Sequence, residues 1–432
     1  MKKYPSYKDS GVEWIGEIPS HWKISKSKFY VKLKSGDGFR NELQGRDDGG
    51  DYPFFKVSDT NNKGNEKYLI NSNNYVTQKE FNEERWTQFN KGTLVFPKIG
   101  MGLLLNKRRI LNQPSFIDNN MMGLEPNQHL DTEYTYYNYL LVDFKDYCSD
   151  GTVPSINESQ VGIIPILIPP ISEQHQIVSY LDEKTSQIDT LIQSKQRKIK
   201  LLKEKRTSLI NEVVTKGLNS DVEMKNSGVE WIGEIPSHWE INKMKYLVNL
   251  INDKQETSDG DIKISPENVE SDTGKCFDLY SDYSGQGVKF KEGDVLLNKL
   301  RLYLKKILLT DYSGYSMGEM IVLRTNNKFI NKYLFYLLFN QGLIDFLDSQ
   351  SQGVKLPRVS PDTILNTHLP NPSINEQSQI VEFLDYETHK IDTTIKFEEQ
   401  KIGLLKEYKK SLISEVVTGK VNVQEEVNEV LV

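Results

Sequence analysis

SEQHQIVSYLDEKTSQIDTLIQSKQRKIKLLKEKRTSLINEVVTKG, residues Ser172 to Gly217, predicts one long helix that organises the rest of the chain. Neither proline nor glycine interrupts this helix, Ser172 can cap its N-terminus, Glu173 lies in the first turn, and Gly217 supplies a stop signal. The pattern recurs from Asn375 to Lys420, with more than half of the aligned residues identical. We therefore expect two long helices that arose from one duplicated plan.

Both helices share one heptad frame, in which the a and d positions are spaced alternately by three and four residues. The seam of the first helix consists of Val178, Leu181, Thr185, Ile188, Ile192, Lys195, Ile199, Leu202, Arg206, Leu209 and Val213. The seam of the second consists of Val381, Leu384, Thr388, Ile391, Ile395, Glu398, Ile402, Leu405, Lys409, Leu412 and Val416. So narrow an apolar seam is typical of a coiled-coil pair. The alternative is a long amphipathic helix lying on a globular core, which would need a broader apolar face.

The middle of this seam carries opposite charges in the two copies, Lys195 in the first and Glu398 in the second. An antiparallel pairing around that midpoint would join Ile192 with Ile402, Ile199 with Ile395, and Lys195 with Glu398. A parallel pairing would also oppose the two charges, but it would place both domains at the same end. A charged pair in an apolar seam can fix the register without adding net stability. We expect Lys195→Glu alone to weaken folding or register, and the added exchange Glu398→Lys to recover most of the loss.

Composition limits the class of protein. With 432 residues, of which 26% are charged, the chain is long enough for two or three globular domains. No apolar leader and no run of apolar residues long enough to span a membrane is present, which predicts a cytoplasmic protein. The two cysteines, Cys148 and Cys276, fit neither a disulfide framework nor a zinc site. The net charge of −6 argues mildly against DNA binding as a bulk property, although local clusters decide that binding.

A second repeat opens each half of the chain. The motif SGVEWIGEIPSHW, residues Ser10 to Trp22, returns unchanged as Ser227 to Trp239. Because glycine and proline separate its tryptophans, we expect a compact turn or short strand whose indoles pack on the following domain. For His21 and His238 within the motif, packing or hydrogen bonding is expected, since neither has a second potential metal ligand nearby.

The segments between these repeats are related more loosely. FNKGTLVFPKI, residues Phe89 to Ile99, matches FKEGDVLLNKL, residues Phe290 to Leu300, which aligns Lys98 with Lys299. The expected fold is mixed α/β (α+β) recognition domains with two long antiparallel coiled-coil helices, a tandem duplication with pseudo-twofold symmetry. The expected boundaries are a first domain 1–171, a first helix 172–217, a second domain 218–374, a second helix 375–420 and a C-terminal tail 421–432.

This order of elements resembles the specificity subunit of type I restriction-modification enzymes, over essentially the full chain. The resemblance rests on the helix starts PPISEQ and NPSINEQ, the helix ends LLKE-SLI-EVVT, and the twin SGVEWIGEIPSHW motifs. It implies two target-recognition domains held by two antiparallel helices. It also implies binding to double-stranded DNA and to two methyltransferase (modification) subunits, with restriction (motor-nuclease) subunits joining for cleavage.

The absence of catalytic motifs agrees with that implication. The chain has no GxxxxGK[ST] phosphate loop, no [DN]PP[YF] tetrad, no HExxH and no GxSxG elbow. The glycine pairs Gly36-Asp37-Gly38 and Gly100-Met101-Gly102 do not continue into a GxGxxG helix start and predict turns. We expect neither catalytic residues nor a metal or cofactor site in this chain. S-adenosylmethionine, ATP and Mg²⁺ are expected only in partner subunits.

DNA recognition needs cations for phosphates and forked or amide groups for base edges. In the first domain the candidates are Arg40, Arg46, Lys56, Lys98, Lys107, Arg108 and Arg109. In the second domain they are Lys263, Lys299, Arg301, Lys305, Lys306, Lys355 and Arg358. The first helix adds Lys195, Arg197, Lys198, Lys200, Lys203, Lys205 and Arg206. Each of these could instead be an ordinary solvated surface residue, and the aligned pair Lys98 and Lys299 is the strongest of the candidates.

Two further expectations concern the target and the partners. A helix of this length spans roughly 65 Å at about 1.5 Å per residue, or up to roughly 19 base pairs at about 3.4 Å each. We therefore expect a bipartite, non-palindromic target with an unread spacer. The duplication offers the Trp motifs twice, so Trp14, Trp22, Trp231 and Trp239 are expected to bind two copies of one methyltransferase. The alternative function is a helical scaffold whose lobes bind proteins or glycans and never touch DNA.

Overall fold

The computed structural model describes residues 2–46, 49–149, 151–353 and 355–423, and the chain divides into two compact units. Unit 1 consists of Met1–Gln193 together with Ile402–Val432, and unit 2 consists of Ser194–Lys401. Each unit therefore combines one α/β domain with one part of each long helix. Unit 2 is one continuous segment of the chain, whereas unit 1 is formed by two segments that lie far apart in the sequence.

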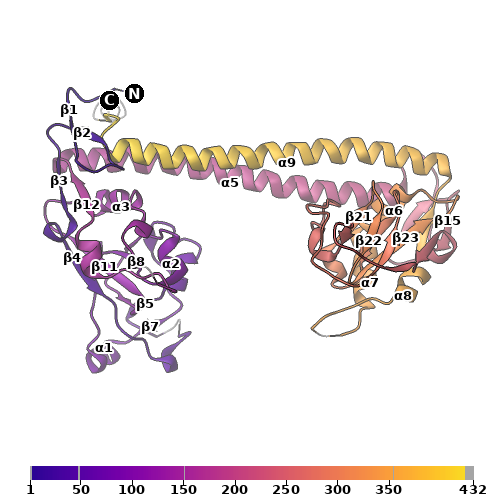
Figure 1. Cartoon of the computed structure of the whole chain (residues 1–432), viewed down its shortest axis with the longest axis horizontal. Coiled ribbons are helices and arrows are strands. Elements are labelled where there is room, and N and C mark those ends of the chain that lie inside the picture. The colour runs from indigo at the N-terminus through magenta and orange to yellow at the C-terminus, as the bar shows by residue number, and fades with distance from the viewer. Residues whose placement is uncertain (1, 47–48, 150, 354, 424–432) are drawn as a thin grey trace. The chain divides into compact units, whose positions relative to one another are not determined.

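The two long helices are α5, Ile171–Lys216, and α9, Ile374–Val417 (Figure 1). Their start and end differ by only a few residues from the bounds expected from the heptad pattern. In unit 2, Lys195 pairs with Glu398, and Arg206, further along α5, pairs with Asp392, earlier in α9. The helices are therefore antiparallel, because a residue further along α5 contacts a residue earlier in α9. The ion pair expected at the middle of the seam thus forms, with 2.9 Å between Lys195 Nζ and Glu398 Oε2.

The seam is the buried stripe of this helix pair within each unit. In unit 1, Leu181, Ile188 and Ile192 of α5 and Ile402 of α9 are buried. In unit 2, Ile391 and Ile395 of α9 are buried, and Ile199 of α5 is half-buried. An apolar stripe of this width removes one line of side chains from water and leaves the opposite helix faces solvated.

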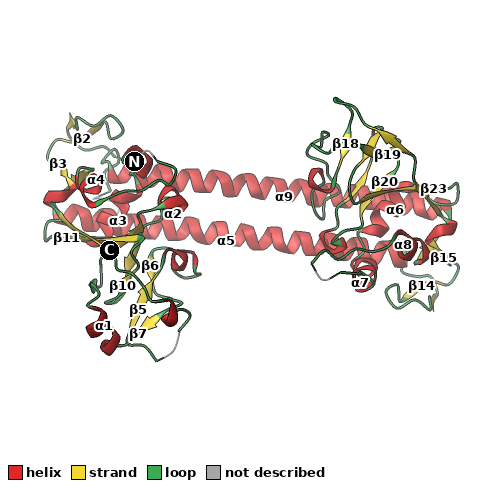
Figure 2. Cartoon of the chain, turned by 60° about the horizontal axis from the view of Figure 1, so that its bottom comes forward, coloured by secondary structure: helices red, strands yellow, loops and turns green. Residues whose placement is uncertain are grey.

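Unit 1 contains short strands in four sheets and a few short helices (Figure 2). Its main sheet has the order β4-β11-β8-β9-β6, and smaller sheets have the orders β10-β5-β7, β12-β3 and β1-β2. The strands are β1 Tyr7–Asp9, β2 Glu17–Pro19, β3 Lys23–Lys26, β4 Val31–Ser35, β5 Tyr52–Phe55, β6 Tyr68–Leu69, β7 Tyr75–Val76, β8 Leu94–Pro97, β9 Arg109–Leu111, β10 Phe116–Ile117, β11 Met121–Pro126 and β12 Pro165–Ile168. The helices are α1 Gln78–Glu84, α2 Gly100–Leu104, α3 Thr132–Leu140 and α4 Glu158–Gly162.

Unit 2 repeats this plan. Its sheets have the orders β16-β23-β20-β21, β17-β19-β22-β18, β15-β24 and β13-β14. The strands are β13 Met224–Asn226, β14 Glu234–Pro236, β15 Glu240–Lys243, β16 Val248–Ile251, β17 Lys254–Glu256, β18 Lys263–Ile264, β19 Gln286–Phe290, β20 Val295–Asn298, β21 Ile307–Leu309, β22 Gly314–Ser316, β23 Met320–Thr325 and β24 His368–Asn371. The helices are α6 Asn331–Leu338, α7 Gln341–Ser349 and α8 Pro361–Asn366.

Strand register makes the two domains comparable residue by residue. Strand β11 pairs antiparallel with β8 so that Met121 lies opposite Pro97, and β23 pairs with β20 so that Met320 lies opposite Asn298. The next residues along β8 and β20 are Lys98 and Lys299, which therefore occupy equivalent positions. The sequence alignment of these two lysines agrees with this register.

Each Trp motif packs against a long helix within its own unit. Trp22 is fully buried, and its indole Nε1 donates to Glu173 Oε2 at 2.9 Å in the first turn of α5. Trp239 is buried in the same way and donates to Glu376 Oε1 of α9 at 2.9 Å. A carboxylate at a helix N-terminus is stabilised by the helix dipole, and here it also satisfies the buried indole. The prediction that Trp22 and Trp239 bind a partner is therefore wrong, since neither side chain reaches the surface.

The histidines of the motifs act as hydrogen-bonding groups. His21 Nε2 lies 2.7 Å from Glu173 Oε1, and His238 Nε2 lies 2.7 Å from Glu376 Oε1. Although burial opposes its ionisation, hydrogen bonds from His238, Trp239 and Ser373 lower the pKa of Glu376 to about 2. Of the expected tail 421–432, residues 421–423 are described, with Asn422 bridged to Lys2, and residues 424–432 lie outside the described part.

Candidate nucleic-acid interface

Equivalent corners of the two domains bring together several of the expected DNA-contact residues. In unit 1 the backbone N–H of Ile156 donates to the carbonyl of Lys98 at 2.9 Å, just after strand β8. In unit 2 the N–H of Val359 donates to the carbonyl of Lys299 at 3.1 Å, just after β20. Each corner thus joins the end of a central strand to the loop that precedes a short helix, α4 or α8. We call these the first corner and the second corner.

The second corner gathers four cationic side chains. Lys299 Nζ lies 3.1 Å from Glu319 Oε2, and Arg358 Nε lies 2.9 Å from Glu319 Oε1. The N–H of Arg301 donates to the carbonyl of Pro357 at 2.9 Å, which fixes Arg301 beside the same loop. The carbonyl of Lys355, in that loop, accepts a long hydrogen bond from Arg301 Nη2 at 3.5 Å.

Charge at the second corner is unbalanced. Glu319, with a quarter of its side chain exposed, is held by both Lys299 and Arg358. Arg301 and Lys355 are exposed and have no carboxylate ion pair among the described residues. Four cations around one carboxylate leave a net positive surface, which attracts phosphate groups, and a shared carboxylate orders two of the cations before any ligand binds.

The first corner is more neutral and richer in amide and hydroxyl groups. Lys98 lines a pocket of about 360 Å³ together with Ser35, Ile99, Ser155, Ile156, Asn157, Glu158, Ser159 and Gln160. Glu158 accepts a hydrogen bond from the N–H of Ser35 at 3.0 Å, and Gln160 Nε2 donates to Ser149 Oγ at 3.1 Å. Burial raises the pKa of Asp118, and hydrogen bonds from Asn120 and the charges of Lys56 and Lys98 oppose this in part.

Several other candidates of the first domain are held by contacts inside it. Arg46 donates to Glu80 at 2.9 Å and to the carbonyl of Tyr75 at 2.9 and 3.1 Å, and its hydrogen bond lowers the pKa of Glu80 to about 2. Arg40 forms an ion pair with Glu84, and Lys107 donates to Asn61. Lys56 Nζ lies 4.5 Å from the centre of the Phe39 ring. Each of these cations therefore already has a partner within the first domain.

Arg108 and Arg109 have structural roles. Arg108 is fully buried, donates to the carbonyl of Val142 at 3.0 Å, and stacks with its guanidinium 3.8 Å from the centre of the Phe144 ring. Burial lowers the pKa of Arg108 to about 9. Arg109 is half-buried and donates to the carbonyl of Thr60 at 3.0 Å. The prediction that Arg108 contacts DNA is wrong, because its side chain does not reach solvent.

The remaining candidates of the second domain divide between interior and surface. Lys305 is buried, donates to Gln341 Oε1 at 2.5 Å, and has a pKa lowered by burial, so it is not a DNA contact. Lys306 Nζ donates to the carbonyl of Pro266 at 2.6 Å. Lys263 lies half-buried in β18, which belongs to a different sheet from β20.

The cations of α5 also have mixed roles. Lys195 and Lys198 both bind Glu398, at 2.9 and 2.8 Å, and Arg206 pairs with Asp392 at 3.2 Å. Four further cations of α5 are exposed, namely Arg197, Lys200, Lys203 and Lys205. Of these, Lys200 has a long contact of 3.9 Å with Glu204 one turn away.

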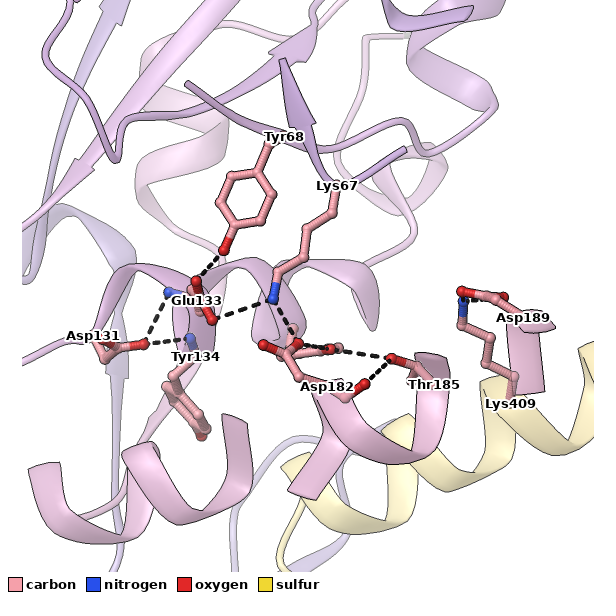
Figure 3. Close-up of polar contacts among 10 residues, drawn as sticks. Lys67, Tyr68, Asp131, Glu133, Tyr134, Asp182, Thr185, Asp189 and Lys409 are labelled. Carbon is pink, nitrogen blue, oxygen red and sulfur yellow. Dashed lines mark hydrogen bonds and ion pairs between the residues drawn. The ribbon is translucent and has the colours of Figure 1, made fainter. Parts of the chain in front are cut away.

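A polar network that the sequence analysis missed fastens the first domain to α5 (Figure 3). Tyr137 of α3 donates to Asp182 Oδ1 at 2.5 Å and lies 3.4 Å from Thr185 Oγ1. Lys67 Nζ bridges Asp182, at 2.5 Å, and Glu133, at 3.2 Å. Burial and the hydrogen bond to Asp182 raise the pKa of Tyr137 far above its usual range, so the hydroxyl stays a donor.

Unit 2 contains the same arrangement. Tyr336 of α6 donates to Asp385 Oδ1 at 2.7 Å and lies 3.2 Å from Thr388 Oγ1, and Lys332 pairs with Asp385 at 2.7 Å. We call these the tyrosine clamps. Their signal in the sequence was the pair Asp and Thr, spaced by three, at identical places in both helix copies. The sequence analysis gave these threonines, Thr185 and Thr388, only as seam positions.

Within the described residues no cluster of three or more histidine, cysteine, aspartate or glutamate side chains could hold a metal ion. In the same part of the chain, no helix is both long enough and apolar enough to cross a membrane.

Comparison with known proteins identifies the family. The family model described as "Type I restriction modification DNA specificity domain" matches residues 19–201 and again 236–407, which together cover most of the chain. The two matches correspond to the two halves of the duplication. Each match begins within or next to a Trp motif and ends within a long helix.

Curated relatives and solved structures agree with that match. A putative type I restriction enzyme MjaX specificity subunit from Methanocaldococcus jannaschii is 24% identical, over 95% of this chain and 96% of the relative. The type I restriction enzyme EcoDI specificity subunit from Escherichia coli is 20% identical, over 95% and 90%. A chain from a structural study of type I R-M complex assembly superposes with a TM-score of 0.69 at 12% identity, covering 94% of this chain and 99% of that one. The HsdS subunit from Thermoanaerobacter tengcongensis gives a TM-score of 0.52 at 13% identity, covering 94% and 98%.

Proposed function

We propose that this chain, which belongs to the type I restriction modification DNA specificity family, reads the two halves of a split DNA target with its first and second corners. The chain is a specificity subunit that recognises the DNA target, and catalysis resides in partner subunits. The observation that carries the assignment of the corners is the gathering of Lys299, Arg301, Lys355 and Arg358 at the place equivalent to Lys98. S-adenosylmethionine, ATP and Mg²⁺ are proposed to be used by the partners.

The chemistry of each corner suits a different reading task. Lysine and arginine side chains bind phosphates and fix the register of a protein on DNA, whereas amide, hydroxyl and guanidinium groups read base edges. The second corner supplies mostly cations. The first corner supplies Ser155, Asn157 and Gln160 around a single lysine. Two unlike corners in one chain support a target with two unlike halves, which is a non-palindromic bipartite target.

The Trp motifs support a second part of the proposal, binding of two methyltransferase subunits. Trp14 has 40% of its side chain exposed. Trp231, its equivalent in unit 2, is half-buried, and its indole N–H has no hydrogen-bond partner among the described residues. The same motif is offered once by each unit, so one partner surface can bind twice. Restriction subunits are proposed to join this assembly for cleavage.

Salt dependence of DNA binding tests the corner assignment. Full-length chain in complex with its methyltransferase should bind duplex DNA with an affinity that falls steeply as salt rises, since phosphate contacts release counterions. Lys299→Ala should weaken binding and reduce that slope by about one unit. Lys79→Ala is the matched control, because Lys79 is exposed on α1 and only faces Glu83 at 3.9 Å. A flat salt response of the wild-type complex would favour the scaffold alternative and reject DNA recognition by the corners.

The partner proposal is tested by mass measurement of the assembled complex. Two methyltransferase copies per chain are expected, and Trp14→Ala or Trp231→Ala should lower assembly more than it alters the sequence that is methylated. Circular dichroism of each variant checks that the fold survives. A single methyltransferase per wild-type chain would contradict the symmetry argument.

A further inference from the structure

Arg301 has a backbone conformation that arginine seldom adopts. Its φ is 52°, in the left-handed region, and the equivalent residue of the first corner is Gly100 with φ 71°. The equivalence follows from matching hydrogen bonds, in which Gly100 N–H donates to Pro154 at 2.8 Å and Arg301 N–H donates to Pro357 at 2.9 Å. Glycine adopts this conformation without steric cost, whereas a residue with a Cβ is disfavoured there. The fold would therefore accept glycine at position 301 more readily than arginine.

The surroundings of Arg301 differ from those of its cationic neighbours. Lys299 and Arg358 share the carboxylate of Glu319 at 3.1 and 2.9 Å, which holds them in place. Arg301 is exposed, and the contact found for its guanidinium is the 3.5 Å approach to the carbonyl of Lys355. The equivalent of Glu319 in the first corner is Asn120. The backbone carbonyl of Asn120 accepts from the N–H of Lys98 at 2.8 Å, and the backbone carbonyl of Glu319 accepts from the N–H of Lys299 at 3.1 Å. The ordering carboxylate is thus specific to the second corner.

We propose that Arg301 reads a guanine of the second half-site in the major groove, while Glu319 holds Lys299 and Arg358 ready for the flanking phosphates. This inference rests on the proposed function of the second corner. A phosphate contact can be made from many unstrained surface positions, so it does not explain an arginine at a left-handed position. A bidentate contact to guanine O6 and N7 needs a fork aimed in one direction, which a fixed backbone supplies.

The first test uses the backbone strain. Arg301→Gly in the full-length chain should leave thermal stability unchanged or raise it, because glycine fits φ 52°. The same variant should lose about tenfold or more in affinity for the cognate target. Arg85→Gly is the matched control, since Arg85 is also exposed with φ 55° but ends helix α1, where a left-handed residue is common. It should keep full affinity. Equal losses from both variants would mean a general charge effect and would overturn the assignment.

The second test asks which atom Arg301 reads. Methyltransferase-bound wild-type and Arg301→Gly chains are titrated with cognate duplexes in which each guanine of the second half-site in turn is replaced by 7-deazaguanine, which lacks the N7 acceptor. One replacement should cost the wild-type complex about tenfold and cost the variant almost nothing further. Arg301→Lys should keep the salt slope but not this discrimination, since lysine has no fork.

The outcomes separate this inference from the proposed function. If every 7-deazaguanine replacement costs both complexes equally, or if the second half-site contains no guanine, Arg301 does not read guanine even though the corner binds DNA. If Lys299→Ala and Arg301→Gly both leave cognate binding of a salt-sensitive wild-type complex unchanged, the corner assignment itself fails.

Discussion

Glu398 is surrounded by more cations than the sequence pattern indicated. Its carboxylate lies 2.9 Å from Lys195, 2.8 Å from Lys198 and 3.7 Å from Lys401. Of these three lysines, only Lys195 occupies a seam position. Lys198 and Lys401 lie at flanking positions, which the heptad pattern does not take into account. The carboxylate is therefore the centre of a small network, and removing it leaves three ammonium groups close together.

This network changes the expected result of the charge exchange. Lys195→Glu should destabilise the chain, because it puts two carboxylates together in the seam. Adding Glu398→Lys should recover only part of the loss, since the new lysine faces Lys198 and Lys401. A double-mutant cycle on the denaturation midpoint measures the recovery. Purely additive losses would contradict the contact between residues 195 and 398.

The same network predicts a pH dependence. Hydrogen bonds from Lys198 and Lys195 lower the pKa of Glu398 from 4.5 to about 2. A carboxyl whose pKa is lowered in the folded state contributes stability that is fully present above the unfolded pKa and is lost as pH falls through the folded one. The stability difference between wild type and Glu398→Gln should therefore be constant above about pH 5 and shrink from there toward pH 2. A difference that stays unchanged over this range would argue against the ion pairs.

The role of a residue could be predicted only where a sequence pattern indicates which residues are in contact. The alignment of Lys98 with Lys299 and the facing of Lys195 and Glu398 followed from repeats and heptads. Arg108 could not be placed, because a run of basic residues gives no sign that one of them enters a core and stacks on Phe144. Trp22 and Trp239 were misassigned since repetition of a motif is explained equally well by a shared structural role.

Among the elements, the tyrosine clamps are one of the contacts that attach α3 to α5 in unit 1 and α6 to α9 in unit 2. In each clamp a hydroxyl donates to an aspartate that also binds a lysine, so two partners hold the carboxylate in place. The contact lies between a recognition domain and the helix that carries it. It therefore contributes to how firmly each domain is held on its helix.

Removing a clamp hydroxyl should weaken this attachment. Tyr137→Phe and Tyr336→Phe should each lower the free energy of unfolding by about 1 kcal/mol, the usual contribution of a hydrogen bond, with more if the aspartate is left desolvated. Tyr386→Phe is the matched control, because Tyr386 is two-thirds exposed on α9. Denaturant unfolding of the full-length chain measures all three. Losses no larger than that of Tyr386→Phe would mean that the clamps do not stabilise the domains.

The long helices were the part of the fold that the sequence determined best, because heptad spacing, caps and stop signals all act locally along the chain. The tyrosine clamps could not be predicted from the sequence. They need a tyrosine from one element to meet an aspartate from another, and the sequence spacing between Tyr137 and Asp182 carries no periodic signal. The order of strands in each sheet was likewise not predictable, since pairing partners such as β4 and β11 lie far apart in the chain.

At the scale of the whole molecule, the two units are built from the same parts taken from different places in the chain. Trp22 packs on the C-terminal end of α9 near Gly419, as Trp239 packs on the end of α5 near Gly217. Lys2 is bridged to Asn422, and Tyr7 donates to the carbonyl of Gly419 at 3.1 Å. The first Trp motif thus completes the last helix, as the second Trp motif completes the first helix. Each unit thus contains one corner, one clamp and one Trp motif.

The central claim is that the two corners read separate halves of one target, and methylation mapping tests it most directly. A host genome carrying the methyltransferase is mapped with the wild-type chain and with Arg301→Gly. We predict a bipartite, non-palindromic target with an unread spacer for the wild type, and a variant whose methylated sites are relaxed in one half only. A single uninterrupted target, or relaxation of both halves by this one substitution, would contradict the account.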